Sequence, residues 1–435
     1  MDIARAGDRG LLLALGPVDA PELHAAAARA RAAEGVAACV VGHSSLLVLF
    51  HGQPDRDAVM RAVKSSSSVE KRESRRLTIP VSFDGPDLEE LLARAGLSRE
   101  DFIEKASRLT LTARYLGFRG GFAYLDGWPR EWSMPRRPTS RARVPAGTFA
   151  IAGAVAAFYP IDSPGGWNLL GRTRMDLAYA IRAGDEIVIE GSGGDRAGSP
   201  RDAATNGGAS HGGAPAGLEL LHAPLSTTVG AYDLSRLERG MPPGGPFDPV
   251  AAAVANAAVG NPPGTPLLEC AMTGPRARVQ PGLIAAWCDP QLRVTFHEGE
   301  FAIGRIEHGL RGYLSTGTHR VDSAVARRED RSVIGAVAGP HDTPLREIEC
   351  EVTHQLDRVG IRLRPLREVT LQAPADLASA GVQFGTLQLH PDGSIIAMGP
   401  DHPVTGGYLQ PMTVISSERW KLGQLGPGDR VAFQA

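Results

Sequence analysis

The chain has few cysteines and no strong charge of either sign. Its 4 cysteines are far apart and form no C-x-x-C pair, so the sequence predicts neither a disulfide framework nor a zinc knuckle. Lysine and arginine number 46, and aspartate and glutamate 48, which gives a formal net charge of −2. This balance offers no electrostatic basis for binding nucleic acid or an anionic membrane.

Long apolar runs are also absent. No stretch approaches the roughly 20 residues that a membrane-spanning helix needs. The first residues, Met1-Asp-Ile-Ala-Arg, lack the basic start and apolar run of a secretory signal. The sequence therefore predicts a cytoplasmic protein with no membrane partner.

Several standard catalytic motifs are missing. The chain has no H-E-x-x-H, no G-x-S-x-G and no cluster of histidine and cysteine, so no metal site is predicted. Residues 117–124 form a glycine-rich loop but lack the Lys-Ser/Thr ending of a phosphate-binding P-loop. A lysine in a Met-Lys-Met-type turn is missing too, so no biotin attachment site is predicted.

Glycine and proline, by contrast, are abundant. The chain contains 52 glycines and 33 prolines but only 6% aromatic residues, which favours many turns over long helical bundles. With 435 residues it exceeds what one hydrophobic core usually serves. We therefore expect several domains rich in short strands.

The first 85 residues are predicted to form a ferredoxin-like domain, because strands and helices alternate in the split β-α-β order of that fold. The expected strands cover residues 11–15, 37–41, 45–50 and 77–82, and the expected helices cover 21–34 and 55–63.

Residues 86–192 are predicted to form two short helices and a small barrel. The helices begin near Asp87 and at Ser98, where Ser98-Arg-Glu-Asp has the form of a capping box. Short β-prone runs follow, with strands expected at 152–159 and 185–190.

Residues 193–216 are rich in glycine, serine and alanine and are predicted to be a flexible linker. Residues 217–435 again have the pattern of short strands and turns. One helix is expected at 249–258, with Asp248 as its cap. The linker divides the chain into two halves.

One pattern occurs in both halves. Residues 163–167 and 404–408 each place two glycines before an aromatic residue, and each is followed by a Gly-Asp turn, at Gly184 and Gly428, that opens a strand-like segment. Two unrelated sets of turns are the simpler interpretation. The shared order of features instead predicts a duplicated module, whose glycine corners face a common cavity.

Charged residues supply the remaining candidates. Residues 135–143 contain four arginines, whose guanidinium groups suit carboxylate or phosphate ligands, although a solvated basic face is an equal alternative. In the second half the candidates are Asp233, Asp248, Glu269 and Arg358, and most lone charges of this kind lie on the surface.

Taken together, these stretches resemble the B and C subunits of 5-oxoprolinase, the Kip inhibitor and antagonist family. Residues 1–192 resemble the B subunit, for example at Gly121-Phe-Ala-Tyr-Leu and Ser163-Pro-Gly-Gly-Trp. Residues 217–435 resemble the C subunit, for example at Asp357-Arg-Val-Gly-Ile-Arg and Gln424-Leu-Gly-Pro-Gly-Asp. The resemblance implies an α+β, mainly β chain with a ferredoxin-like N-terminal domain followed by cyclophilin-like barrels.

The resemblance also implies an activity, the ATP-dependent hydrolysis of a small lactam together with a separate lactam-utilisation A subunit. The resemblance does not decide whether the chain forms a homo-oligomer. The catalytic candidates are Arg136, Arg137, Asp248 and Arg358. The substrate-binding candidates are Phe122, Tyr124, Arg141, Ser163, Gly165, Gly166, Trp167, Arg172, Asn256, Glu269, Thr405, Gly406, Gly407 and Tyr408.

Several positions depart from the family pattern. Alanine, valine or glycine replaces polar family residues at Ala106, Val155, Ala156, Gly230 and Ala231. Each lost polar group costs a reaction on the order of 10²-fold in rate. The alternative is therefore a diverged member whose cleft serves another small-molecule transformation in specialised metabolism, or a Kip-like regulatory role. Carboxyl transfer is a third alternative, for which no carrier domain is present.

Overall fold

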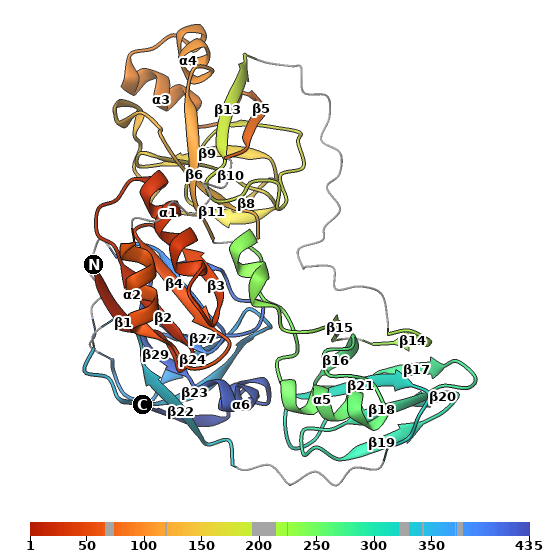
Figure 1. The fold of residues 1–435 in the computed structure, drawn as a ribbon. Coiled ribbons are helices and arrows are strands. Elements are labelled where there is room, and N and C mark those ends of the chain that lie inside the picture. The colour runs from red at the N-terminus through yellow and green to blue at the C-terminus, as the bar shows by residue number, and fades with distance from the viewer. Residues whose placement is uncertain are drawn as a thin grey trace.

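The computed structural model describes residues 1–65, 74–117, 120–193, 215–223, 225–321, 330–341, 343–369, 371 and 377–435. In this part of the chain, two closed barrels are accompanied by a four-stranded sheet and by separate three- and five-stranded sheets (Figure 1). The predicted linker at 193–216 lies almost wholly outside the described residues.

The N-terminal sheet is antiparallel and has the order β1-β2-β4-β3. Helices α1 and α2 pack on one of its faces, and each begins at an aspartate cap, Asp19 and Asp55. The elements are β1 (Asp2–Arg5), β2 (Gly10–Ala14), α1 (Ala20–Arg31), β3 (Val36–Val41), β4 (Ser45–Phe50) and α2 (Arg56–Lys64).

The strand predicted at 77–82 exists but was assigned to the wrong sheet. It is β5 (Arg76–Ser82), which lies in the first barrel between β12 and β13. Its apolar side chains Ile79 and Val81 enter the barrel core. The edge beside β2 belongs instead to β1, because β1 and β2 form a hairpin that local patterns did not reveal.

The first barrel has the strand order β10-β7-β6-β13-β5-β12-β9. The strand predicted at 152–159 exists as β10 but begins only at Val155, because Gly153 turns the chain at φ +61° after β9 ends at Ala152. The elements are α3 (Leu88–Ala95), α4 (Arg99–Ala106), β6 (Thr110–Leu116), β7 (Ala123–Asp126), η1 (Arg130–Trp132), β8 (Arg141–Val144), β9 (Thr148–Ala152), β10 (Val155–Phe158), β11 (Ser163–Gly165), β12 (Asn168–Arg172) and β13 (Glu186–Ser192). The predicted cap at Ser98 is confirmed, since Ser98 Oγ accepts a bond from the Asp101 N–H.

Residues 218–317 form two open sheets, of orders β14-β17-β20 and β15-β16-β21-β18-β19. The helix predicted at 249–258 is confirmed as α5, capped by Asp248. The elements are β14 (Leu218–His222), β15 (Ser226–Val229), η2 (Leu234–Arg239), α5 (Pro249–Ala258), β16 (Leu267–Ala271), β17 (Arg276–Val279), β18 (Ile284–Cys288), β19 (Val294–His297), β20 (Glu300–Ala302) and β21 (Arg311–Gly317).

The second barrel has the order β22-β29-β26-β27-β24-β23-β30 and occupies only the end of the second half. Its elements are β22 (Val333–Ala338), β23 (Glu347–Leu356), β24 (Gly360–Pro365), β25 (Ala380–Gly381), β26 (Thr386–Leu389), β27 (Ile395–Met398), β28 (Thr405–Gly406), β29 (Leu409–Val414), η3 (Ser416–Glu418), α6 (Arg419–Gly423) and β30 (Arg430–Gln434).

The predicted duplication is confirmed strand by strand. Taken in chain order, the strands of both barrels pair in the same way, including the parallel pairs β5–β13 and β22–β30 and the ribbons β8–β11 and β25–β28. The Gly-Asp turns also match. Asp185 accepts a bond from the Arg182 N–H, and Asp429 accepts one from the Gly426 N–H.

The N-terminal sheet joins the two halves. Its face opposite the helices packs against the β25–β28 ribbon of the second barrel and against η2, as in Figure 1, where it lies in front of the blue barrel. The shared core contains Leu12, Ala38, Leu47, Leu237, Ala380 and Val404. Among the described residues, no helix is both long and apolar enough to cross a bilayer.

The two barrels touch where the end of β6 meets β28. Thr405 Oγ1 donates to the Leu116 carbonyl at 3.0 Å. A Cβ atom on Gly117 would lie 1.7 Å from Thr405 Oγ1, so the approach requires glycine at that position.

We predict that Gly117→Ala lowers the free energy of unfolding by about 1–3 kcal/mol, because the methyl group must push the barrels apart. Gly52→Ala is the control, since no atom lies within 4 Å of its added Cβ. Urea denaturation measures both. In the Gly117→Ala background, Thr405→Ala should restore part of the loss, and equal effects of the two glycine changes would contradict the prediction.

Candidate functional site

Five aromatic side chains gather on the outer face of the first barrel, and we call them the aromatic cluster: Tyr115, Phe122, Tyr124, Tyr159 and Trp167. Tyr115 stacks on Tyr124 with ring centroids 4.3 Å apart, and Tyr124 lies 5.8 Å from Trp167. Phe122 meets Tyr159 at 5.2 Å and Trp167 at 5.7 Å, edge to face. The cluster presents a rigid apolar wall that includes three hydroxyl groups.

Burial controls the chemistry of these hydroxyl groups. It raises the pKa of Tyr115 to about 12, although a hydrogen bond with Ser379 opposes the shift, and it raises the pKa of Tyr124 further. Burial also raises the pKa of Tyr159. All three phenols therefore stay neutral near pH 7 and act only as hydrogen-bonding groups.

Two of the four arginines in the loop beside the cluster bind the same carboxylate. Asp87, only 5% exposed, accepts bonds from Arg137 at 2.9 Å and from Arg141 at 2.8 Å to each of its oxygens. It also accepts the Leu169 N–H at 2.7 Å. Asp87 therefore fastens the loop to the strand that follows Trp167.

Arg136 differs from its neighbours. Its guanidinium carbon lies 5.8 Å from the centre of the Trp167 ring, and within the described residues it forms no ion pair. Its side chain is exposed. Of the predicted arginines in this loop, Arg136 is therefore the one whose charge is available to a ligand.

The second barrel supplies the facing side. Tyr408, which is 38% exposed, stacks on His390 with centroids 4.1 Å apart. On the same side, Tyr115 of the aromatic cluster hydrogen-bonds with Ser379, and a Cβ on Gly407 would lie 3.5 Å from Ser379 Oγ. Together with the Thr405–Leu116 bond, these contacts bring both Gly-Gly corners to one place, which we call the inter-barrel site.

One glycine of each corner is closely packed. A Cβ on Gly165 would lie 2.2 Å from the Tyr159 hydroxyl, and one on Gly406 would lie 2.8 Å from Gln388 Nε2. The Gly166 carbonyl accepts the Arg137 N–H at 2.8 Å, and Gly407 is exposed. Ser163 is buried and donates to the Ile161 carbonyl at 3.1 Å, so its hydroxyl maintains the turn before the corner.

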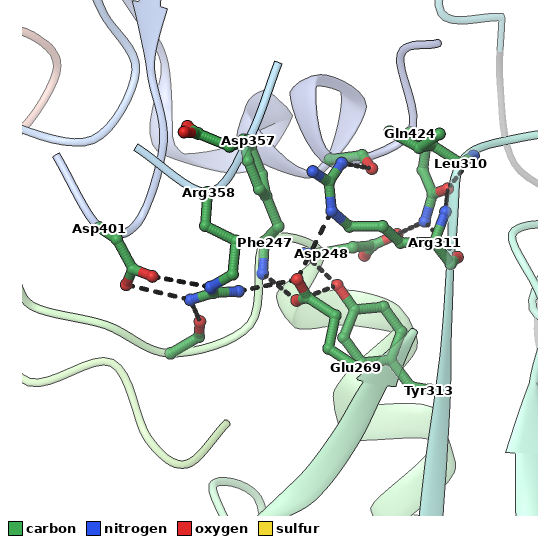
Figure 2. A network of polar contacts seen from close by, with 12 residues as sticks. Phe247, Asp248, Glu269, Leu310, Arg311, Tyr313, Asp357, Arg358, Asp401 and Gln424 are labelled. Carbon is green, nitrogen blue, oxygen red and sulfur yellow. Dashed lines mark hydrogen bonds and ion pairs between the residues drawn. The ribbon is translucent and has the colours of Figure 1, made fainter. Parts of the chain in front are cut away.

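A second cluster of predicted residues lies elsewhere, where residues 218–317 meet the second barrel. Figure 2 shows Glu269 at its centre. Glu269 accepts bonds from Arg358 at 2.7 Å, from the Tyr313 hydroxyl at 2.8 Å and from the Phe247 N–H at 2.8 Å. Arg358 also donates to Asp401, at 2.8 Å from Nε to the carboxylate.

Asp248 completes this network from the start of α5. It is fully buried, accepts the Ala251 N–H as helix cap, and accepts Gln424 Nε2 at 2.6 Å. Gln424 in turn accepts the N–H groups of Leu310 and Arg311, at 3.1 and 3.0 Å. The network therefore crosslinks three segments that are distant in sequence.

Burial alone would raise the pKa of Glu269, but Arg358, Arg311 and the hydrogen bonds lower it overall. Glu269 is therefore ionised in the folded chain. Its hydrogen-bond donors Arg358, Tyr313 and Phe247 all belong to the protein, so the network holds these segments together.

The remaining predicted residues lie apart from the inter-barrel site. Asn256 is buried, donates to the Thr265 carbonyl at 3.0 Å and accepts the Ser315 hydroxyl at 2.6 Å. Arg172 pairs with Asp84 at 2.8 Å on the surface. Asp248, Glu269 and Arg358 likewise belong to the Glu269 network, at the junction of residues 218–317 with the second barrel.

Sequence reasoning missed several residues that the structure brings together. Tyr115, Gln388 and His390 lie at the inter-barrel site, and Arg311 and Gln424 belong to the Glu269 network. Nothing in the local sequence around Gln388 or His390 marked them as site residues.

Comparison with known families matches this architecture. A model described as the carboxyltransferase domain, subdomains C and D, matches residues 1–183. A second model, for subdomains A and B, matches residues 239–317 and 311–435. The chain belongs to the carboxyltransferase-domain family. The predicted kinship with the B and C subunits of 5-oxoprolinase and the predicted fold class, α+β and mainly β, are confirmed.

Individual relatives cover parts of this carboxyltransferase-domain chain. The B subunit of 5-oxoprolinase from Escherichia coli O157:H7 is 37% identical over 138 residues, which are 31% of this chain and 62% of that protein. The C subunit of 5-oxoprolinase from Haemophilus influenzae is 33% identical over 79 residues, which are 18% of this chain and 25% of that protein. The chain thus spans less than two thirds of each of these relatives.

One solved structure matches nearly end to end. The protein TTHA0988 has a TM-score of 0.82 at 24% identity, and the match covers 98% of this chain and 100% of that one. This likeness shows a shared fold. Among the described residues, no three histidine, cysteine, aspartate or glutamate side chains are grouped as metal ligands, and the expectation of no metal stays a prediction.

We predict that Asp87→Ala lowers the free energy of unfolding by about 2–3 kcal/mol, because Arg137, Arg141 and the Leu169 N–H lose their acceptor; both arginines reach solvent, which limits the loss. Asp84→Ala, which removes the surface pair with Arg172, should cost less than about 1 kcal/mol. Urea denaturation followed by tryptophan fluorescence compares them. Similar losses in the two variants would refute the role of Asp87.

Glu269 leads to a prediction about how the free energy of unfolding depends on pH. Its lowered pKa means that its stabilising effect is complete above the unfolded glutamate pKa, about 4.3, and is lost as pH falls through the folded value. Glu269→Gln should cost about 3 kcal/mol at pH 7 and flatten the acid limb of the stability profile. Glu219→Gln, at an exposed pair with Arg278, is the control. An unchanged acid limb in Glu269→Gln would contradict this account.

Proposed function

We propose that this chain is the fused B–C component of a 5-oxoprolinase-type enzyme, which hydrolyses a small lactam at the expense of ATP together with a separate A subunit. The observation that supports the proposal is Arg136, a guanidinium group without an ion-pair partner among the described residues, placed over Trp167 beside the first glycine corner. The relatives named as B and C subunits of 5-oxoprolinase make a lactam the first candidate.

In the proposed site, different residues bind the two ends of such a substrate. Arg136 binds a carboxylate, to which a guanidinium gives charge-assisted hydrogen bonds. The rings of Tyr124 and Trp167 pack against the flat apolar body of the lactam, and the neutral tyrosine hydroxyl groups offer hydrogen bonds without competing for its charge. We propose a positioning role, and not contact with substrate, for Arg137, which is bound to Asp87, and a structural role for Asp248 and Arg358, which belong to the Glu269 network.

We propose that the A subunit, and not this chain, binds ATP. ATP supplies the free energy for lactam opening when it is bound, but the described end of the glycine-rich loop, residues 120–124, leaves no room for a phosphate at its glycines. Cβ atoms on Gly120 and Gly121 would lie 2.7 and 2.6 Å from atoms of Tyr179, so the chain itself fills that space. A cytoplasmic location is proposed on the four buried free thiols, which suit a reducing compartment.

A second candidate is the diverged family member with another small-molecule ligand or a Kip-like regulatory role. Ala150, Ala152 and Ala157 support it, because they place methyl groups beside the aromatic cluster. Ala157 falls in the segment where the family resemblance implies polar residues. Such a face binds a ligand without activating it.

Release of ADP on addition of 5-oxoproline, with an A subunit supplied, tests the proposal. We expect Arg136→Ala to lower kcat/KM about 10–100-fold, the usual effect of losing a hydrogen bond to a charged group, with Tm unchanged because Arg136 is exposed. Arg143→Ala is the control, since Arg143 follows shortly after in β8, is 74% exposed and pairs with Asp162.

Two results would count against the proposal. Wild-type chain that releases no ADP in response to 5-oxoproline favours the diverged alternative. Equal activity of Arg136→Ala and Arg143→Ala would move the binding site away from the inter-barrel contact.

A further inference from the structure

Gln388 is a buried side chain with an unsatisfied donor. It lies in β26, is 3% exposed, and its Nε2 atom has no hydrogen-bond partner among the described residues. An unpaired buried donor is costly, and native proteins satisfy most such groups. The Gln388 amide therefore keeps a donor that a bound ligand can satisfy.

The duplicated architecture shows how unusual this position is. Leu389 pairs with Leu409, the residue after Tyr408, as Ile151 pairs with Asn168, the residue after Trp167. Gln388 is thus the counterpart of Ala150, and His390 the counterpart of Ala152. The first barrel fills this outer face with methyl groups, while the second places an amide and an imidazole there.

The unsatisfied amide lies at the glycine corner of the inter-barrel site. Gly406 leaves room for it, since a Cβ there would meet Gln388 Nε2 at 2.8 Å. His390 stacks on Tyr408 directly beyond this corner, and its Nε2 atom is buried without a partner among the described residues too. Burial lowers the pKa of His390, assisted by Arg362, so its ring is neutral near pH 7.

We propose that Gln388 determines specificity at the inter-barrel site by donating from Nε2 to the carbonyl oxygen of a small cyclic amide. This assignment rests on the proposed function, which locates the site. It adds the group that binds the carbonyl oxygen of the ligand. Arg136 of the first barrel then binds the carboxylate and Gln388 of the second barrel binds the amide oxygen. Each barrel recognises one end of the ligand.

This role differs from that of Gln410, the other buried glutamine on the same face. Gln410 Nε2 donates to the Gly381 carbonyl at 3.3 Å, and its N–H donates to His341 Nδ1 at 2.9 Å. Gln410 is thus satisfied by the protein and stabilises the ribbon. It offers a matched control of the same residue type, burial and face.

The test measures binding of three probes to the full chain by calorimetry: 5-oxoproline, 2-pyrrolidinone, which lacks the carboxylate, and proline, which lacks the ring carbonyl. Gln388→Met should weaken 5-oxoproline and 2-pyrrolidinone about 10-fold and leave proline unchanged, since only the carbonyl donor is lost. Its Tm should stay the same or rise, because an unsatisfied amide is removed. Gln410→Met should lower Tm and keep the order of the probes.

Each outcome is decisive. An unchanged ratio of 5-oxoproline to proline affinity in Gln388→Met overturns the assignment and means that the amide binds only an ordered water. Wild-type chain that binds none of the probes overturns it as well. Loss of carbonyl preference in Gln388→Met without any lactam-dependent ADP release by the wild type supports the assignment while refuting the proposed hydrolysis.

Discussion

The close approach of Gly117 to Thr405 sets the distance between the two barrels, and the candidate site depends on that distance. A hydroxyl group occupies the space where a side chain at 117 would begin. Because the contact lies between the ends of β6 and β28, it positions the strands that carry Tyr115 and the second glycine corner. The aromatic cluster and the Tyr408–His390 pair therefore lie on strands that this contact joins.

Charge is distributed so that binding and stability are carried by different residues. Asp87 and Glu269 are buried and each gathers guanidinium groups around a carboxylate. Such pairs contribute little net stability by themselves, but loss of one partner is expensive, so they enforce one arrangement of the loops and sheets they join. Arg136 lies next to one of these pairs without entering it, which leaves its charge for a ligand.

Local signals in the sequence predicted much of the fold. The caps Ser98 and Asp248 marked α4 and α5, and the repeated Gly-Gly-aromatic and Gly-Asp features marked the duplication. The sheet membership of β5 could not be predicted, because alternation specifies which side chains are buried and not which strand is the partner. A parallel neighbour more than 100 residues away left no trace in the local pattern.

The candidate site was predicted less completely for the same reason. Residue type suggested arginines and acidic groups, but only the structure separates Arg136 from Arg137 and assigns Asp248 and Glu269 to an internal network. Gln388 has no distinctive neighbours in sequence. Gln388 stands out because its Nε2 atom lacks a hydrogen-bond partner among the described residues, and only the three-dimensional structure shows this.

The parallel pairing of first and last strands has a consequence for how each module folds. β5 pairs with β13 and β22 with β30, so no barrel closes until its final strand has been synthesised and has returned to its first. Contacts of such long sequence separation slow folding, because the entropy of a long loop is lost before the pairing stabilises it. During translation the first strand of each module therefore keeps an unpaired edge until the last strand of that module emerges.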